Sequence, residues 1–241
     1  GGTMVALPVS SAWIVRTLAM VVTALVAIRY TGGLYAWVTE NRLEQPAYEV
    51  IQRLPGGVEV RRYEEYTIAE TVLKASFKEA TSNGFRLCAG YLFGKNVPRE
   101  KVGFLRRPPP GTPGEKMEMT APVRQAATEF GTGAKSSTVK VSFVMSSKRT
   151  LSSLPVPRDA KVQLRRVPSH TAAFKRFNGP PPTDKVIAKK RDEVLSAIHA
   201  TGGGLRPVSA AETMVYGYHD PFLVPNVLRR NEVGVMVDQC A

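Results

Sequence analysis

The sequence predicts an α+β domain in which an antiparallel sheet packs with two helices, preceded by one N-terminal hydrophobic helix. After residue 47, most segments alternate apolar and polar residues, which is typical of strands. Two amphipathic segments interrupt them, so the order is strands, helix, strands, and then the same again. An uncharged run, TLAMVVTALVAI at 17–28, precedes everything else. We therefore divide the chain into a membrane-anchoring helix with its linker (1–46) and a folded domain (47–241).

The hydrophobic helix is expected over residues 12–38, with Arg16 and Arg29 on either side of the uncharged run. Tryptophan and tyrosine lie near both of its ends, as they do at membrane interfaces. A spanning helix needs about 20 apolar residues, a length reached only if one arginine extends to a lipid headgroup. A single membrane span is favoured, while a targeting signal and a protein-buried helix remain open. Residues 1–15 lack Lys and Arg, so the positive-inside rule places the domain on the matrix, stromal or cytoplasmic side.

The first half of the domain begins with alternating residues over 48–75, where a Pro-Gly-Gly turn at 55–57 predicts a hairpin followed by a third strand. Ser76 opens a helix with Glu79 three residues later as a capping box, and Gly94 ends it. The expected buried face of this helix consists of Phe77, Ala80, Phe85, Cys88 and Leu92, and Asn83-Gly84 interrupts its middle. Residues 95–115 read as a long surface loop.

The second half repeats the pattern. Strands are expected in MEMTAPVRQ (117–125) and STVKVSFVMS (137–146), and two more in KVQLRRVPSHTAAFKRF (161–177), with a break near Pro168. A helix begins near Thr183 and ends at the glycines of 202–204. AETMVYGY (211–218) and NEVGVMVD (231–238) give the final strands.

The composition excludes several functional classes. The net charge is +13, but the basic residues are scattered and no nucleic-acid-binding fingerprint accompanies them, so nucleic acid is not an expected partner. The two cysteines are far apart and predict neither a disulfide framework nor a zinc site. Metalloprotease, serine-hydrolase, P-loop and dinucleotide motifs are missing, so we expect no enzyme and assign no catalytic residue.

Six strings, in order along residues 47–238, resemble the SOUL heme-binding family. They are the opening strands YEVIQRLPGGVEVRRYEEYTIAET, the helix end GYLFGKN, KMEMTAPV, LPVPRD, FKRFNG, and YHDPF followed by RRNEVGVMV. The resemblance implies a distorted eight-stranded antiparallel β-barrel with two helices, built from two pseudo-repeats. The chain departs from the family where Glu118 replaces a small or apolar residue, and where the loop between Tyr218 and Arg229 is one residue longer.

The resemblance also implies that heme or another tetrapyrrole binds in an apolar cleft beside the first helix of the domain. The matching cleft positions are Tyr91, Phe93, Met117 and Met119, with Lys116 near a propionate. Met117 and Met119 equally fit an ordinary strand with two residues on one face. Family members with an axial histidine carry it early in the domain.

Here the first histidine is His170, in a turn, followed by His199 and His219. None is expected to bind iron, and no other metal site is predicted. RRNE at 229–232 is either a contact to a ligand or partner or, as we favour, a lock between loop and strand.

Two functions remain open. The favoured one is a non-catalytic accessory subunit of an organellar membrane complex, with other subunits and the lipid bilayer as partners. The alternative is a membrane-tethered heme or tetrapyrrole carrier. The high positive charge favours the mitochondrial inner membrane over the chloroplast thylakoid membrane. A Glu118 side chain directed into the cleft would weaken the case for heme.

Overall fold

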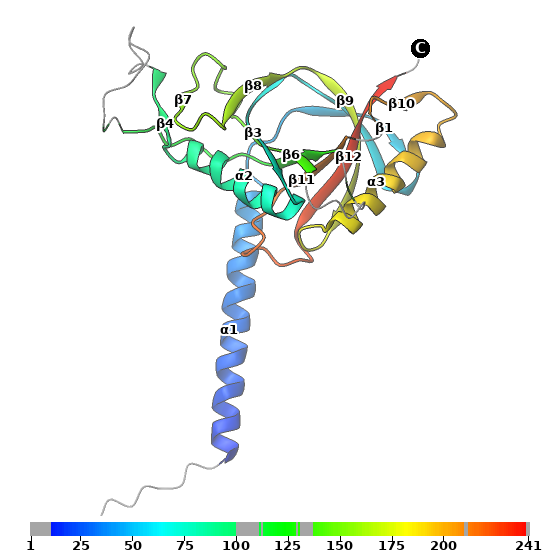
Figure 1. Ribbon diagram of the computed structural model, residues 1–241. Helices are drawn as coiled ribbons and strands as arrows, with labels where there is room; N and C mark the ends of the chain where they lie inside the picture. Colours follow the sequence, from blue (N-terminus) through cyan, green and yellow to red (C-terminus); the bar gives the residue numbers. More distant parts are fainter. Residues whose placement is uncertain are drawn as a thin grey trace, which may run out of the picture.

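The computed structural model describes residues 11–99, 111, 113–128, 130, 137–209 and 212–239. In chain order its elements are α1 (Ser11–Glu40), β1 (Tyr48–Leu54), the 3-10 turn η1 (Pro55–Gly57), β2 (Val58–Tyr63), β3 (Tyr66–Ala75), α2 (Phe77–Leu92), β4 (Asn96–Val97), β5 (Val123–Ala127), β6 (Ser137–Val144), β7 (Val156–Pro157), β8 (Gln163–Val167), β9 (His170–Asn178), α3 (Asp184–His199), β10 (Leu205–Pro207), β11 (Thr213–Gly217) and β12 (Arg230–Gln239). Figure 1 shows α1 projecting from a domain in which α2 and α3 pack on one large sheet. The predicted α+β class is confirmed.

The domain consists of two halves with the same topology, β2-β3-α2-β5-β6 and β8-β9-α3-β11-β12. In the sheet their strands are ordered β2-β9-β12-β11-β5-β6-β3-β8, with all pairings antiparallel. Exchanging each strand for its counterpart in the other half gives the same order read backwards. A pseudo-twofold axis therefore lies between β11 and β5. The remaining strands are additions: β1 pairs with β2, β10 pairs with β12, and β4 pairs with β7 as a separate small sheet.

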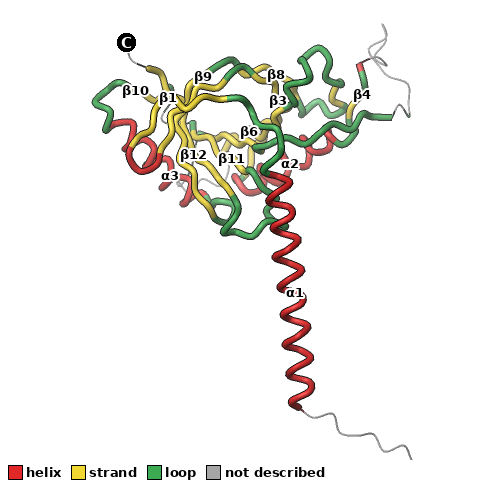
Figure 2. The backbone as a smooth tube through the Cα atoms, turned by 180° about the vertical axis from the view of Figure 1, so that it is seen from behind, coloured by secondary structure: helices red, strands yellow, loops and turns green. Residues whose placement is uncertain are grey.

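Two short links force the large sheet to curl. Residues 64–65 alone join β2 to β3, although six strand spacings separate these strands in the pairing order. In a flat sheet the two strands would be about 29 Å apart, whereas the link spans at most about 11 Å. Residues 168–169 impose the same constraint on β8 and β9. The sheet therefore bends toward a barrel, as Figure 2 shows, although no pairing of β1 with β8 is recorded among the described residues.

The hairpin predicted at the start of the domain is confirmed. Leu54 pairs with Val58 across the turn, and Gly56 and Gly57 both adopt positive φ, at 73° and 72°. Residues without a Cβ adopt this region at little energetic cost. The Pro-Gly-Gly string thus fixes the register of β1 and β2.

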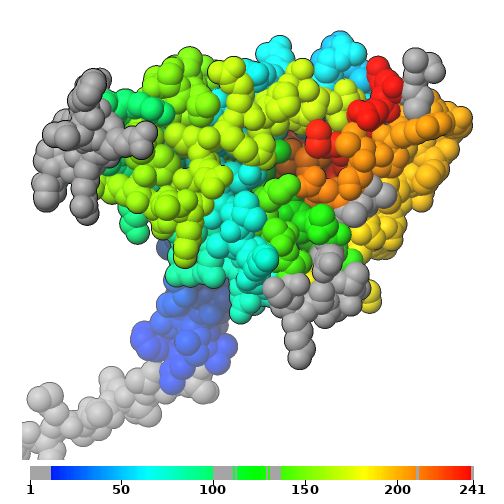
Figure 3. Space-filling model, turned by 45° about the horizontal axis from the view of Figure 1, so that its top comes forward, coloured from blue at the N-terminus to red at the C-terminus, as the bar shows by residue number. Residues whose placement is uncertain are grey.

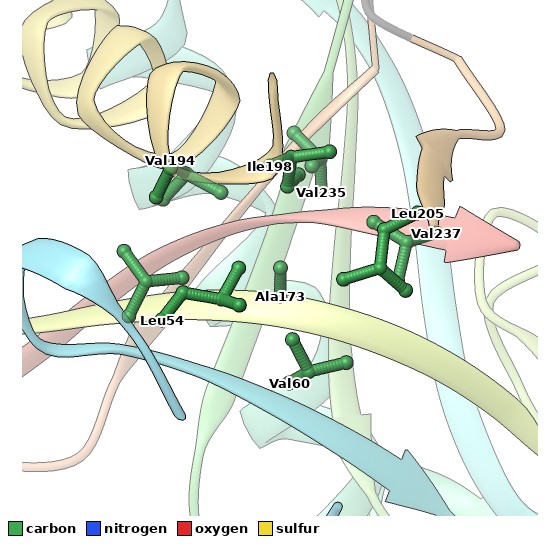
Figure 4. Packing of buried hydrophobic residues seen from close by; sticks show 10 residues of the cluster. Leu54, Val60, Ala173, Val194, Ile198, Leu205, Val235 and Val237 are labelled. Atoms are coloured by element: carbon green, nitrogen blue, oxygen red, sulfur yellow. The ribbon is translucent and has the colours of Figure 1, made fainter. Parts of the chain in front are cut away.

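Helix α3 closes one part of the outer face of the sheet. Its residues Val194 and Ile198 pack onto strands β2, β9 and β12, and Leu205 of β10 completes the cluster. Figure 4 shows these side chains converging from the helix and from the sheet beneath it. The buried members are Leu54, Val58, Val60, Ala173, Val194, Ala197, Ile198, Leu205, Val235 and Val237.

Helix α2 covers the pseudo-symmetric part of the same face. Ser76 caps it, because its Oγ accepts a hydrogen bond from the Glu79 N–H and donates one to the Glu79 carboxylate at 2.7 Å. The prediction that Phe85 is buried was wrong: its side chain is 41% exposed and only touches Phe143 at its edge. Gly84 takes the buried position instead, because a side chain there would collide with β6.

Replacing Gly84 by Ala is expected to lower the free energy of unfolding by about 1–3 kcal/mol, as overpacking does. A Cβ at this position would lie 2.6 Å from the Cβ of Val141 on β6. This effect should outweigh the gain of about 1 kcal/mol that Ala brings to a helix interior. Gly90→Ala is the matched control in the same helix, because its Cβ would meet only the flexible Lys95 side chain at 3.0 Å. Equal midpoints of denaturant unfolding for the two variants would contradict this account.

Three other expectations differ from the structure. The segment 117–120 is not a strand, and β5 begins at Val123, directly after Pro122, which has no N–H for a ladder. The expected loop at 95–115 starts with the short strand β4, whose Asn96 is fully buried. Its residues 100–110 and 112 lie outside the described part of the chain. Strand β10 was not predicted, because three residues are too few to show an alternation of apolar and polar side chains.

Helix α1 is 30 residues long, and most of it stands clear of the domain. Its length and apolar composition over Ala12–Glu40 meet the criterion for crossing a membrane, a criterion that a signal sequence also meets. Its apolar side chains are exposed over most of its length. Figure 3 shows the blue N-terminal helix projecting from the body of the domain. Only near its C-terminal end are Gly33 and Ala36 buried against the domain.

Candidate ligand cleft

A surface cleft of about 470 Å³ opens where the chain before β5 runs beside the chain after β6. The two strands are antiparallel with Val123 opposite Phe143, so the residues preceding the one lie next to those following the other. The cleft is lined by Lys116, Met117, Glu118, Met145, Ser146, Lys148, Arg149, Ser153 and Leu154. Its size lies within the range of small-molecule sites.

The floor of the cleft is apolar. Met145 is 5% exposed and Leu154 is fully buried, and both belong to the core cluster beneath α2, against which Met117 also packs. Two thioethers and one isobutyl group offer a soft, polarisable surface that adapts to a flat ring. The floor therefore favours an apolar or aromatic ligand.

The rim of the cleft is charged, with three cations and one anion. Lys148 lies 3.8 Å from Glu118, and both side chains are more than 70% exposed. Arg149 pairs with Glu115, which lies just outside the cleft. Among the described residues, no ion pair is recorded for Lys116. The rim thus presents a net positive charge, which suits a ligand with carboxylates.

One wall of the cleft is fastened to the linker that follows α1. The carboxylate of Glu44 accepts hydrogen bonds from the Ser146 hydroxyl at 2.7 Å and from the Ser147 N–H at 2.6 Å. Burial raises the pKa of Glu44, but these hydrogen bonds and the charge of Lys148 outweigh it, so the pKa is lowered. The turn after β6 is therefore held by an ionised linker residue at neutral pH.

Of the five residues predicted for the cleft, two line it and three do not. Lys116 and Met117 line it. Met119 is half-buried against the same core cluster but is not part of the lining. Tyr91 is 1% exposed, and its hydroxyl donates to the Pro155 carbonyl at 2.9 Å, so it serves the core. Phe93 is 56% exposed and shares only a backbone bridge with Lys116.

The second wall was not predicted from the sequence, and it consists of Met145, Ser146, Lys148, Arg149, Ser153 and Leu154. The run SSKR after a predicted strand was the only signal for it. Glu118, identified as a departure from the family, also lines the cleft.

None of the three histidines, all of which lie within the described part of the chain, lines the cleft. The expectation that His170 lies in a turn was wrong, because His170 is the first residue of β9. It is half-buried there and stacks on Tyr63, with 5.1 Å between the ring centroids. The Nδ1 of His219 accepts a hydrogen bond from the Arg230 N–H at 3.0 Å. No cluster of three metal-binding side chains occurs among the described residues. The donors present fit a flat apolar ring with acidic substituents, held without a histidine ligand.

The RRNE motif lies elsewhere, inside the curl of the sheet, and its geometry is that of a lock. Glu232 is fully buried, and its carboxylate accepts hydrogen bonds from Arg61 at 2.7 and 3.0 Å and from Arg230 at 2.7 Å. Tyr218 donates a further hydrogen bond at 2.8 Å. The amide of Asn231 donates to the Gly179 carbonyl at 3.1 Å. The motif thus ties β12 to β2 and to the loop after β9.

The structure is that of a pseudo-twofold α+β domain with a surface cleft, joined to an N-terminal apolar helix. The sequence model of the SOUL heme-binding proteins matches residues 43–236, and the chain belongs to this family. No curated protein sequence matches the chain.

Solved structures share the fold at low sequence identity. The C-terminal domain of EcmrR superimposes with a TM-score of 0.51 at 10% identity, covering 80% of this chain and 99% of that domain. EcmrR in its complex with DNA gives a TM-score of 0.51 at 8% identity, covering 96% of this chain and 73% of EcmrR. A hydrolase from Listeria innocua gives 0.48 at 11% identity, covering 75% and 91%. At such identities the two likenesses to EcmrR bear on the fold alone.

Proposed function

We propose that this protein is a membrane-tethered tetrapyrrole-binding protein that holds its ligand in the cleft between the segment before β5 and the turn after β6. The observation that carries this proposal is the pairing of an apolar floor with a cationic rim in a member of a heme-binding family. A tetrapyrrole has the same two parts, a flat apolar ring and carboxylate substituents.

Different residues of the cleft would contact the two parts of the tetrapyrrole. Met117, Met145 and Leu154 would contact the ring, while Lys116 and Arg149 would donate charge-assisted hydrogen bonds to the carboxylates. Because no histidine lines the cleft, the ligand would be held by apolar enclosure and charge, and it would exchange readily. Such binding suits a carrier or buffer better than a redox centre.

Helix α1 would anchor the domain in the membrane of an organelle. Its apolar surface is bare, and residues 1–15 carry no Lys or Arg, so the basic domain would lie on the matrix or stromal side. The net charge of +13 leads us to favour the mitochondrial inner membrane over the thylakoid membrane. Fractionation of the source cells with protease protection would test both the compartment and the side.

The proposal is tested by titrating the full chain, purified in detergent micelles, with hemin while the Soret band is recorded. We expect saturable binding at one hemin per chain. Ser153→Trp places a large side chain in the cleft and should abolish saturation, whereas Ser152→Trp, its exposed neighbour outside the lining, should bind normally. Equal binding by the two variants would refute the assignment of the cleft.

A second function, that of an accessory subunit in a membrane complex, is favoured by Glu118. This residue places a carboxylate on the cleft rim, where it would repel a propionate. Size-exclusion chromatography of the native, mildly solubilised protein separates the two functions. Elution in a large particle without a stoichiometric Soret band supports the subunit, and elution as a small detergent-bound species with that band supports the carrier.

A further inference from the structure

The loop between β11 and β12 lies against the last third of α1. Figures 1 and 2 show it beside the upper end of the helix from opposite sides. The Arg29 guanidinium donates to the Leu223 carbonyl, and to the Phe222 carbonyl at 3.0 Å, and Glu40 accepts from the Asp220 N–H at 2.9 Å. These contacts fix the loop at the level of residues 29–40 of the helix.

Gly33 allows this close approach. A Cβ at its position would lie 2.7 Å from Cδ of Pro225 and 2.8 Å from the Leu223 carbonyl oxygen. The helix and the loop therefore pack backbone against backbone, and the loop is held in one place on α1.

The tip of the loop is apolar and exposed. Its sequence from 221 to 228 is PFLVPNVL, without a charged residue. Phe222 is 82% exposed, Leu223 57% and Val227 74%. Large apolar side chains of this kind, grouped on one short loop, mark a surface that another phase or molecule covers.

The carbonyl groups of the loop are already paired. Every carbonyl from Asp220 to Val227 accepts a hydrogen bond from the chain itself. Arg29 supplies two of these bonds, the Arg229 side chain two more at 2.6 and 2.7 Å, and the Asn178 amide one at 2.7 Å. An ordinary surface loop leaves many carbonyls to water, whereas a segment in contact with lipid must pair them internally.

The level of the loop on α1 matches the edge of a bilayer. From Trp13 to Gly33 the helix rises about 30 Å, which is the thickness of the hydrocarbon core. With Trp13 at one interface, Gly33 lies at the other, together with the exposed rings of Tyr30 and Tyr35. The tip of the loop is then at the boundary between headgroups and acyl chains.

We propose that Phe222, Leu223 and Val227 insert into the interface of the bilayer that α1 spans, so that the domain is attached to the membrane at two points. This inference rests on the proposed membrane anchor. The second contact fixes the rotation of the domain about α1, and with it the position of the cleft relative to the lipid surface. Apolar side chains bury themselves in the interface in the same way as those of interfacial helices.

The test uses the full chain with Cys240→Ser, in which the remaining Cys88 is fully buried. Three single cysteines carry an environment-sensitive fluorophore: Val227→Cys at the loop tip, Leu25→Cys in the exposed part of α1, and Val208→Cys as the control. Val208 is an exposed valine that directly follows β10. Strand β10 pairs with the far end of β12, about 23 Å along β12 from Arg230, so Val208 lies far from the loop between β11 and β12. The labelled proteins are reconstituted in phosphatidylcholine vesicles.

We expect the label at 227 to be quenched several-fold more than that at 208 by a shallow lipid-borne nitroxide, and several-fold less by aqueous iodide. If the lipid-borne nitroxide quenches the label at position 25 while the label at 227 behaves like that at 208, the membrane anchor is supported and the loop contact is refuted. If the label at position 25 also behaves like that at 208, α1 lies outside the bilayer, and both the membrane anchor and the loop contact are refuted. In native membranes, a label at 227 shielded from both quenchers would assign the patch to a protein neighbour and overturn the lipid contact.

Discussion

Replacing Glu232 by Gln is expected to lower the free energy of unfolding by about 3–5 kcal/mol, the range observed when one partner of a buried ion pair is removed. Glu232 is fully buried, and the side chain of its partner Arg61 is 2% exposed. The Arg61 guanidinium also lies 4.6 Å from the centre of the Tyr48 ring and 5.3 Å from that of Phe174. Aromatic faces attract this charge but do not replace a carboxylate. Chemical denaturation of the full chain in micelles measures the loss.

The matched control is Glu49→Gln, which removes the same charge from β1, the strand that pairs with the β2 strand of Arg61. Glu49 lies 3.7 Å from Arg62, but their side chains are 72% and 56% exposed, so water already screens the pair. Exposed pairs contribute about 0–1 kcal/mol. A loss below about 1 kcal/mol for Glu232→Gln, comparable to this control, would mean that the buried network is not what holds β12 to β2.

The same carboxylate predicts how stability depends on pH. Burial raises the pKa of Glu232, but the hydrogen bonds and charges of Arg61 and Arg230 outweigh it, so the pKa is lowered from 4.5. The folded protein therefore holds this carboxylate ionised at a pH where the unfolded chain is already protonated. The stabilisation is complete above about pH 4.5 and is lost as the pH falls through the lower, folded-state pKa. The difference between wild type and Glu232→Gln should accordingly narrow at acid pH.

The pairing of Glu232 with Arg61 shows why the sequence alone left its role open. The two residues are 171 positions apart, and only the order of strands around the pseudo-twofold axis makes β2 and β12 both neighbours of β9. Local patterns give each strand its alternation but not its partner. The repeated order of elements was readable because it depends on local signals.

Gly84 and the cleft illustrate the same limit. A glycine inside a helix reads locally as an interruption, and only the contact with Val141 on β6 shows that it permits close packing. Lys116 and Met117 could be placed in the cleft by their motif. The opposite wall could not, because it depends on the register that sets Val123 against Phe143. Tyr91 and Phe93, also placed by their motif, do not line this cleft, because the direction of a side chain at a helix end follows from packing.

The charge balance of the rim predicts the largest change in ligand affinity. Of the three cations, Arg149 is paired with Glu115, and Lys148 lies near Glu118. Lys116 has no recorded carboxylate partner among the described residues and is the cation most available to a ligand. Lys116→Glu should therefore weaken hemin binding about tenfold or more, since it removes a charge-assisted contact and adds a repulsive charge.

Glu118→Gln should act in the opposite direction and tighten hemin binding about threefold, because it removes the negative charge from the rim and releases Lys148. Lys185→Glu, on the exposed first turn of α3, changes the net charge as much as Lys116→Glu and should leave binding unchanged. Both effects should shrink at high salt, where exposed charges are screened. If Lys116→Glu and Lys185→Glu weaken hemin binding equally, the net charge of the protein and not the rim of this cleft attracts the ligand.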